Sequence, residues 1–246
     1  MNIITLDFET FYSRDFSLTK VTTEEYVRDD RFEVIGVSVK ENDNEAKWFS
    51  GTHKEILDFL SNYEWSNSFA LAHNAMFDSA ILSWRFNIFP MAWLDTLSMA
   101  RATDGLEAGN SLAKLAERYN LGVKGTEVLN AINKRRADFS VDDLSAYGGY
   151  CNNDVELTYS LFHVLVQRFS KSELQLINLT IKMFSEPVLQ LNTPLLEQHL
   201  MQVQARKEKL LAQCVANKET LMSNPKLAEL LIKMGVEPPM KESPTT

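Results

Sequence analysis

The chain has 246 residues, of which 45% are hydrophobic and 24% charged, as in an ordinary globular protein, and its net charge is −8. Its two cysteines, Cys151 and Cys214, lie far apart, which excludes a disulfide framework or a zinc spacing and fits a reducing compartment such as the cytoplasm. No apolar run approaches the roughly 20 residues that cross a bilayer, so no membrane contact is expected. An acidic chain is not expected to bind nucleic acid unless bound divalent cations reverse its local charge.

The N-terminal part of the chain alternates apolar, β-branched runs with helical patterns. This alternation predicts an α/β layered domain. Strands are expected at residues 2–7, 33–39, 45–49, 69–72 and 92–94. Helices are expected between them, at residues 54–60 and 77–86.

The chain then becomes helical. A helix is expected at residues 111–119, and Ser140 with Asp143 resembles a capping box that opens another. The pair Gly148–Gly149 interrupts that pattern, which resumes as far as Phe169. The domain should end near residue 182.

Beyond that point, Thr193 is expected to be the N-cap of a new helix, with Pro194 at its first position. This helix should run to about Met222, and another should occupy residues 224–235. The Pro-rich end, residues 237–246, is typical of a linker.

Asp7 and Glu9 stand two residues apart at the end of the first predicted strand. Side chains two apart on a strand project from the same face, so these carboxylates should lie together. Neighbouring carboxylates are costly unless a cation lies between them, and oxygen ligands suit Mg²⁺ or Mn²⁺. The pattern admits a metal site, although two solvated acids at a strand end are its commoner cause.

Asp78 falls in the first turn of the helix predicted at residues 77–86. The helix dipole stabilises a carboxylate there, which explains Asp78 without a catalytic role. His73 and Asn74, in the preceding turn, are expected to hydrogen-bond locally, and His73 is not expected to bind metal.

Tyr150 and Asp154 are four residues apart on the helix predicted after Ser140, and therefore share a face. A half-buried tyrosine beside an exposed acid would give the same pattern. Tyr147 lies on that face one turn earlier and competes for any role given to Tyr150.

Taken in order, these patterns resemble the motifs of the DEDD superfamily of 3′–5′ exonucleases, which has a ribonuclease H-like fold. The residues that match its D-x-E, N-x-x-x-D and Y-x-x-x-D motifs are Asp7 and Glu9, Asn74 and Asp78, and Tyr150 and Asp154. The last motif marks the tyrosine subclass, because the histidine subclass would need histidine at Gly149. Asp95–Thr96 also matches a strand-then-Asp-Thr element of the family. The resemblance implies a mixed sheet flanked by helices over residues 1–182.

The resemblance implies two divalent cations, Mg²⁺ or Mn²⁺, roughly 4 Å apart. By motif position Asp7 would bridge both ions. Glu9 and Asp154 would complete the site of the nucleophilic water, and Asp78 would hold the second ion. Tyr150 would orient the attacking water, because a phenol with a pKa of about 10 is a poor base at neutral pH.

The resemblance also implies a narrow cleft that admits DNA with a single-stranded 3′ end. Candidate contacts are the residues in or beside the first two motifs, namely Thr10, Phe11, Tyr12, Asn74 and Phe77. The aromatic ones could stack on bases, although such side chains more often belong to a core. Lys124 and the basic run 134–136 could contact the backbone, although a solvated charge run is the simpler interpretation of the latter.

Residues 181–189 and 195–197 resemble the segment that leads into the polymerase domain of bacteriophage family A DNA polymerases, and residues 241–246 resemble a stretch near the start of that domain. Residues 183–246 would then begin a truncated, thumb-like helical region, and the full-length chain would carry a polymerase domain. The implied function is proofreading in the host cytoplasm, with release of nucleoside 5′-monophosphates from DNA. A processivity factor is a further candidate partner. No polymerase motif is present, so this chain is not expected to extend primers.

Two alternatives remain open. The same motifs serve exonucleases that trim RNA 3′ ends, because pocket shape decides whether a 2′-hydroxyl is accepted. A non-catalytic domain that positions a primer terminus is the other, although such domains need not keep all four acids.

Overall fold

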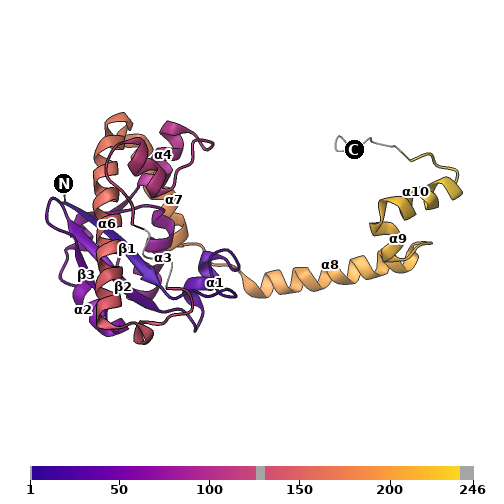
Figure 1. Ribbon diagram of the computed structural model, residues 1–246. Coiled ribbons are helices and arrows are strands. Elements are labelled where there is room, and N and C mark those ends of the chain that lie inside the picture. Colours follow the sequence, from indigo (N-terminus) through magenta and orange to yellow (C-terminus); the bar gives the residue numbers. More distant parts are fainter. Residues whose placement is uncertain (1, 126–130, 239–246) are drawn as a thin grey trace. The chain divides into compact units, whose positions relative to one another are not determined.

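A computed structural model of the chain describes residues 2–125 and 131–238 (Figure 1). The chain forms two compact units, Met1–Val188 and Leu189–Thr246. The division lies beyond the boundary expected near residue 182, because α7 (Lys171–Ser185) continues past it. Within the described ranges, no helix is both long and apolar enough to cross a membrane.

The described part of the first unit is built on a mixed sheet of five strands in the order β3-β2-β1-β4-β5. The strands are β1 (Asn2–Thr10), β2 (Val34–Glu41), β3 (Lys47–Phe49), β4 (Ser68–Ala72) and β5 (Ala92–Asp95). β1 pairs antiparallel with β2 and parallel with β4, so it lies at the centre of the sheet. With its flanking helices this is the expected ribonuclease H-like architecture.

Helices connect and cover the strands. They are α1 (Thr23–Arg28), α2 (His53–Leu60), α3 (Ala75–Phe86), α4 (Thr96–Asp104), α5 (Leu112–Arg118), α6 (Val141–Leu165) and α7, with short 3₁₀ turns η1 (Trp65–Asn67), η3 (Arg136–Asp138) and η4 (Val166–Arg168). The sequence patterns did not predict α1 or α4. The start of α4 is fixed by Asp95, whose carboxylate accepts hydrogen bonds from the backbone N–H groups of Leu97 and Ser98.

The two faces of β1 have different partners. Ile4, Leu6 and Phe8 belong to the core that includes residues of α2 and α3. Ile3 belongs to the core formed with α5 and α6. Because side chains alternate along a strand, Asp7 and Glu9 project toward the α6 side, and Figure 1 shows α6 running across the sheet there.

The helix α6 is continuous through Gly148 and Gly149, where the sequence pattern suggested an interruption. Gly148 is buried, and a Cβ atom built on it would stand 2.3 Å from Trp48 Cδ1. The missing side chain lets the indole of β3 lie against the helix, with its ring 6.0 Å from that of Tyr147. Gly149 faces open space.

These two glycines give a matched pair of substitutions. Gly148→Ala is expected to destabilise the first unit by roughly 1–3 kcal/mol, because the methyl group must displace Trp48. Gly149→Ala should stabilise it by about 0.5–1 kcal/mol, because alanine favours an exposed helix interior. Urea unfolding of both variants measures this, and equal effects of the same sign would contradict the packing described.

The second unit contains α8 (Thr193–Gln213), α9 (Lys218–Met222) and α10 (Asn224–Lys233). Two expectations were wrong here. Asn192 rather than Thr193 is the N-cap, because its side chain accepts a hydrogen bond from Leu195 N. The helix also ends at Gln213 instead of near Met222, because Asn217 caps a separate helix. Residues 239–246, most of the predicted linker and the whole of the polymerase-like tail, lie outside the described residues.

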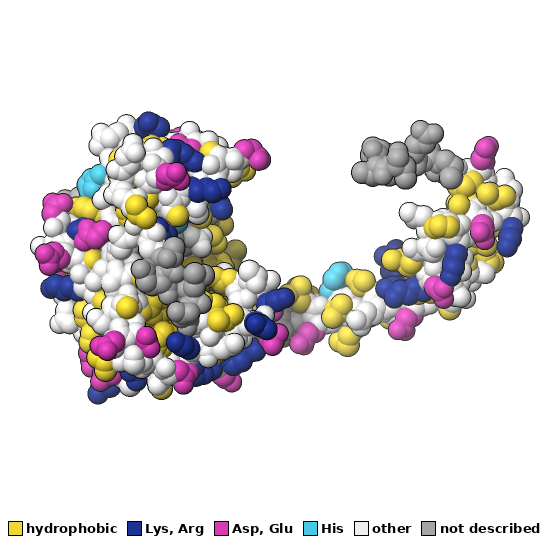
Figure 2. All heavy atoms as spheres, in the orientation of Figure 1, with side chains coloured by type: hydrophobic (Ala, Val, Ile, Leu, Met, Phe, Trp, Pro, Cys, Tyr) yellow, Lys and Arg dark blue, Asp and Glu magenta, His cyan; other side chains and the backbone are white. Residues whose placement is uncertain are grey.

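Large apolar side chains on α8 are exposed, and Figure 2 shows apolar patches along this helix. Those at least half exposed include Leu195, Leu196, Leu200, Met201 and Leu210. On the face of the first unit in that view, basic and acidic side chains are interspersed.

Candidate active site

The site begins with Asp7 and Glu9 on β1. Both are half-buried, and α6 supplies their nearest partners. Cys151 Sγ lies 3.5 Å from Asp7 Oδ2 and 3.4 Å from the Asp7 carbonyl oxygen. The Tyr147 hydroxyl donates to Glu9 Oε2 over 2.5 Å. One helix face therefore holds both carboxylates.

Asp78 joins the same cluster from α3. Its side chain is buried, with 2% exposed, and its Oδ1 accepts a hydrogen bond of 3.1 Å from Phe8 N. Phe8 is the residue between Asp7 and Glu9, so this bond fixes the start of α3 to the acidic part of β1. Helix-dipole stabilisation alone would not bury the carboxylate in this way.

Asp154 completes the set from α6, three residues after Cys151. Its Oδ2 is paired with Lys124 Nζ at 2.6 Å, whereas its buried Oδ1 has no hydrogen-bond partner among the described residues. The Lys124 ammonium also lies 5.1 Å from the ring centre of Tyr150. Tyr150 is half-buried on the same side of the helix. Tyr147 thus contacts Glu9, while Tyr150 lies beside Lys124.

The carboxyl groups of this cluster resist ionisation. Burial and the nearby Asp154 raise the pKa of Asp7 to about 7. Burial and the charge of Asp7 raise the pKa of Glu9 to about 8, and the same two causes raise the pKa of Asp78 well above its ordinary value. Burial raises the pKa of Asp154 too. Burial is the largest cause at all four carboxyl groups, and the charge of a neighbouring carboxylate adds to it at Asp7, Glu9 and Asp78.

A divalent cation fits this donor set. Carboxylate oxygens are the ligands that Mg²⁺ and Mn²⁺ prefer, and the unpaired Asp154 Oδ1 is an acceptor without a donor in the described part of the chain. Lys124 supplies only one positive charge to four acids. Asp7, Glu9, Asp78 and Asp154 are the residues that would hold a metal.

The predicted substrate contacts lie in different surroundings. Thr10 is buried, and its hydroxyl is 3.0 Å from that of Tyr26. Phe11 and Phe77 are partly buried against the core of α1 to α3, and Arg135 lies 4.2 Å from the ring centre of Phe11. Asn74 is exposed in a left-handed conformation, with a φ of 73°.

A cavity of about 430 Å³ opens beside Asn74. Its lining includes His73, Asn74, Leu97, Arg101, Asn110 and Ser111. Both ring nitrogens of His73 have partners, Thr96 Oγ1 at 2.9 Å and the Asn110 carbonyl at 3.1 Å. His73 thus links α4 to the loop that closes the cavity.

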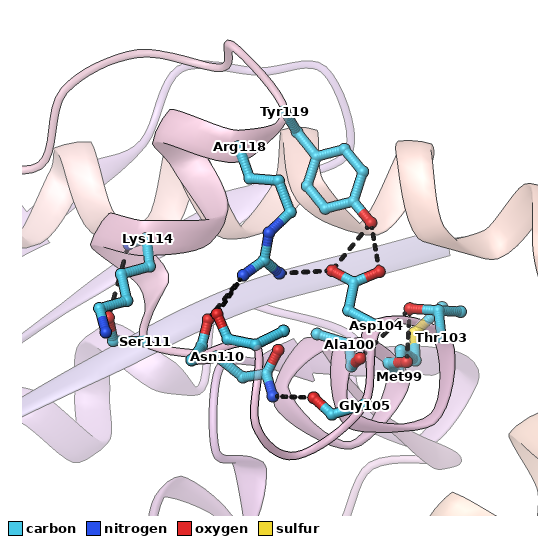
Figure 3. A network of polar contacts seen from close by, with 12 residues as sticks. Met99, Ala100, Thr103, Asp104, Gly105, Asn110, Ser111, Lys114, Arg118 and Tyr119 are labelled. Atoms are coloured by element: carbon cyan, nitrogen blue, oxygen red, sulfur yellow. Dashed lines mark hydrogen bonds and ion pairs between the residues drawn. The ribbon is translucent and has the colours of Figure 1, made fainter.

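That loop is held by a polar network centred on Asp104 (Figure 3). The Asp104 carboxylate accepts hydrogen bonds from the Arg118 guanidinium and the Tyr119 hydroxyl, at 2.5 and 2.8 Å. Arg118 also donates to the carbonyls of Ala108 and Gly109. The wall of the cavity is therefore held by contacts among the end of α4, the end of α5 and the loop between them.

Sequence reasoning missed two residues of the cluster. Cys151 stands four residues after Tyr147 and three before Asp154, so helical spacing would have placed it on this face. For Lys124 the sequence suggests only contact with a nucleic-acid backbone, because no local pattern indicates its pairing with Asp154 thirty residues later.

Residues 22–169 match the family described as 3′–5′ exonuclease, and this match covers more than half of the chain. The chain therefore belongs to the 3′–5′ exonuclease family. The match begins after Asp7 and Glu9, and the structure brings these two residues to the matched Asp78 and Asp154. A search of curated protein sequences gives no match.

Solved structures with this fold include several DEDD-type exonucleases. NrnC from Brucella melitensis has a TM-score of 0.54 and 16% identity, over 75% of this chain and 82% of that one. RNase D from Trypanosoma brucei, in complex with RNA U12, has a TM-score of 0.57 and 15% identity, over 74% of this chain and 63% of that one. The family B DNA polymerase from Pyrobaculum calidifontis has a TM-score of 0.51 and 15% identity, over 75% of this chain and 27% of that one. At these identities the likeness shows the fold.

The chemistry of the family agrees with the donor set. DEDD exonucleases use divalent metal ions, and another NrnC structure, with a TM-score of 0.50, contains bound Mg²⁺. As a member of the 3′–5′ exonuclease family, the chain is a nuclease of the hydrolase class, and its fold is ribonuclease H-like.

Proposed function

We propose that this protein removes 3′-terminal nucleotides from DNA by two-metal-ion hydrolysis, as the proofreading part of a phage family A DNA polymerase. One observation carries the proposal: Asp7, Glu9, Asp78 and Asp154 come from three distant segments and form one electrostatically coupled cluster. Their repulsion would destabilise the fold unless cations offset it. Family membership supports the hydrolytic reaction.

The four carboxylates would hold two Mg²⁺ or Mn²⁺ ions, with Asp7 shared between them. When bound, the ions would acidify the attacking water and stabilise negative charge on the phosphate and the leaving 3′-oxygen. Phe8 N holds Asp78 and the Tyr147 hydroxyl holds Glu9, so both carboxylates are oriented before substrate binds. Four carboxylates and two dications give a site near neutral, which allows an acidic protein to accept a phosphodiester.

Tyr150 would orient the attacking water. Burial raises the pKa of Tyr150 to about 12, so its hydroxyl remains protonated at neutral pH and would donate a hydrogen bond to the attacking water. Tyr147 already donates to Glu9. Burial alone would lower the pKa of Lys124, but its pairing with Asp154 raises it, so Lys124 remains charged and can contact a phosphate oxygen.

The two tyrosines give a direct comparison. Tyr150→Phe is expected to lower the rate of nucleotide release about ten- to hundredfold, the value of a hydrogen bond to a charged or reacting group. Tyr147→Phe should lower it less, because the Tyr147 hydroxyl donates to Glu9 and not to the attacking water. Both variants should show wild-type far-ultraviolet circular dichroism. A larger loss in Tyr147→Phe would transfer the orienting role to Tyr147.

The single strand would enter beside the start of α3. Asn74 is exposed there, and the neighbouring cavity carries Arg101 on its wall. Phe11 and Phe77 are partly buried against the core of α1 to α3, so only part of either ring could meet a base. Thr10 would act indirectly, by holding Tyr26.

The alternative is trimming of RNA 3′ ends. It is favoured by the likeness to RNase D in complex with RNA and to NrnC, which was also solved bound to pGG. DNA is preferred because residues 181–197 resemble the segment that precedes a phage polymerase domain. The exposed apolar side chains of α8 suit a helix that packs against further protein.

Degradation of matched single-stranded DNA and RNA oligomers separates the two substrates. The proposal expects faster release of mononucleotides from DNA, in a reaction that needs Mg²⁺ or Mn²⁺. Faster loss of RNA would replace proofreading with RNA trimming. Activity on neither polymer, with a folded protein and metal present, would favour a non-catalytic domain.

A further inference from the structure

The basic run at residues 134–136 is built into the fold, and its three side chains are partly buried. Arg135 lies 4.2 Å from the ring centre of Phe11 and pairs with Glu33 at 2.8 Å. Arg136 forms no salt bridge with a described residue, and its side chain lines a cavity. The simpler interpretation of the run, as solvated charge, therefore does not hold for Arg136.

This cavity has a volume of about 220 Å³. Basic side chains from three parts of the fold line it, namely His53 at the start of α2, Arg85 near the end of α3, and Arg136 in η3. Pockets that enclose a whole organic ligand hold roughly 300–1,000 Å³, so this cavity suits a smaller group.

The positive charge around the cavity is not offset by acids. Arg85, like Arg136, forms no salt bridge within the described part of the chain. Two carboxylates lie nearby, but Glu33 is already in an ion pair and Glu55 caps the start of α2. Burial and the charge of Arg85 lower the pKa of His53, so these two side chains lie close enough to repel each other. A cavity of this kind favours an anion.

The cavity lies beside the first motif but outside the acidic cluster. Val34, on its wall, pairs with Thr10 at the end of β1. The carbonyl of Glu33, also on the wall, accepts a hydrogen bond of 2.9 Å from Phe11 N. None of the residues that line the cavity belongs to the acidic cluster. The catalytic scheme above therefore leaves the cavity without a role.

We propose that His53, Arg85 and Arg136 form a binding pocket for a phosphate group, carried by a nucleic-acid strand or by a free nucleotide. Guanidinium groups match the geometry of phosphate oxygens and form strong, charge-assisted hydrogen bonds with them. The positive end of the α2 dipole adds to the same field. The pocket would give a chain with a net charge of −8 a point of attachment for phosphate that needs no metal ion.

Binding is measured with inorganic phosphate on the full-length chain, in a chelator and at constant ionic strength set with chloride. The chelator removes metal ions, so the acidic cluster cannot hold the phosphate. The ring proton resonance of His53, identified by its loss in His53→Gln, reports on the pocket by nuclear magnetic resonance. We expect phosphate to shift this resonance until it saturates, and the absence of a saturable shift would overturn the proposal.

Arg136→Gln is expected to weaken phosphate binding about tenfold or more, because it removes a charge-assisted donor. The variant should fold, because the Arg136 side chain makes no hydrogen bond with a described residue. Arg85→Gln should have a similar effect on binding. Unchanged affinity in Arg136→Gln would overturn the proposal.

The matched control is Arg168→Gln, which removes the same charge from an exposed residue of η4 outside the cavity. It should bind phosphate as the wild type does. An equal loss of affinity in this control would show a general effect of net charge and would also overturn the proposal.

Two further ligands distinguish the sources of the phosphate. An oligothymidylate with hydroxyl ends presents only phosphodiesters, whereas thymidine 5′-monophosphate is a free nucleotide. A shift of the His53 resonance by the oligomer, weakened in Arg136→Gln, assigns the pocket to a nucleic-acid backbone, and a shift by the mononucleotide alone assigns it to a free nucleotide. A shift by neither, when inorganic phosphate binds, would contradict the proposal. Because no nuclease assay is involved, the pocket and the proposed function can each fail without the other.

Discussion

Asp7→Asn is expected to lower metal-dependent nucleotide release at least about a thousandfold while the protein stays folded. Asp7 is the carboxylate whose charge acts on both Glu9 and Asp78, and its own pKa is raised by burial and by Asp154. A neutral amide of the same shape keeps the packing but removes the shared anionic ligand. The rate is measured by release of labelled mononucleotides in Mg²⁺ or Mn²⁺.

Asp15→Asn is the matched control, because Asp15 is an exposed aspartate outside the cluster. It should keep wild-type activity. In metal-free buffer at pH 8, Asp7→Asn should be more stable than wild type, since it removes one of the mutually repelling charges. Retention of activity in Asp7→Asn would disprove the site assignment, and an unfolded variant would disprove the claim that Asp7 is dispensable for folding.

The metal-free protein is expected to lose stability as the pH rises from about 5 to 8. The pKa of Asp7 is about 7 and that of Glu9 about 8 in the folded state, against ordinary values of 3.8 and 4.5. The folded state therefore holds protons that the unfolded state has released. The stability that these protons contribute is fully present below the ordinary pKa values. This stability is lost as the pH rises through the folded-state pKa values of Asp7 and Glu9. The free energy of unfolding falls by about 1.4 kcal/mol per pH unit for each proton that only the folded state still holds.

Thermal unfolding in a chelator, from pH 5 to pH 8.5, measures this loss. Burial lowers the pKa of His53 and His73, which acts in the opposite direction near pH 6, so the informative quantity is the difference between wild type and Asp7→Asn. Wild type should show the steeper loss, and Mg²⁺ at pH 8 should restore its stability. Equal pH profiles for the two proteins would contradict the coupling of the carboxylates.

The sequence was sufficient for much of this site because strands and helices impose short, regular spacings. The two-residue spacing of Asp7 and Glu9 predicted a shared face, and the four-residue spacing of Tyr150 and Asp154 predicted another. The order of strands and helices predicted an α/β layered domain, and the resemblance to the exonuclease superfamily implied the mixed sheet. Asp78 could be explained locally by the helix dipole, whereas its hydrogen bond from Phe8 N and the effect of Asp7 on its pKa tie it to the cluster.

What the sequence could not predict depends on contacts between distant segments. Tyr147 and Glu9 are 138 residues apart, and their hydrogen bond determines which tyrosine remains beside Lys124. Gly148 looked like a break in a helix because its packing partner, Trp48, lies on a strand far earlier in the chain. The N-cap at Asn192 was missed because two neighbouring residues, Asn192 and Thr193, are both good caps.

The central claim is that one acidic cluster holds the catalytic metal ions. Anomalous scattering from a crystal of this protein soaked in Mn²⁺ tests it most directly. We expect two peaks, both within bonding distance of the Asp7 carboxylate, with Glu9, Asp78 and Asp154 as the other protein ligands, and no such peaks in Asp7→Asn. Mn²⁺ bound elsewhere, or an unoccupied cluster in a folded protein, would contradict this claim.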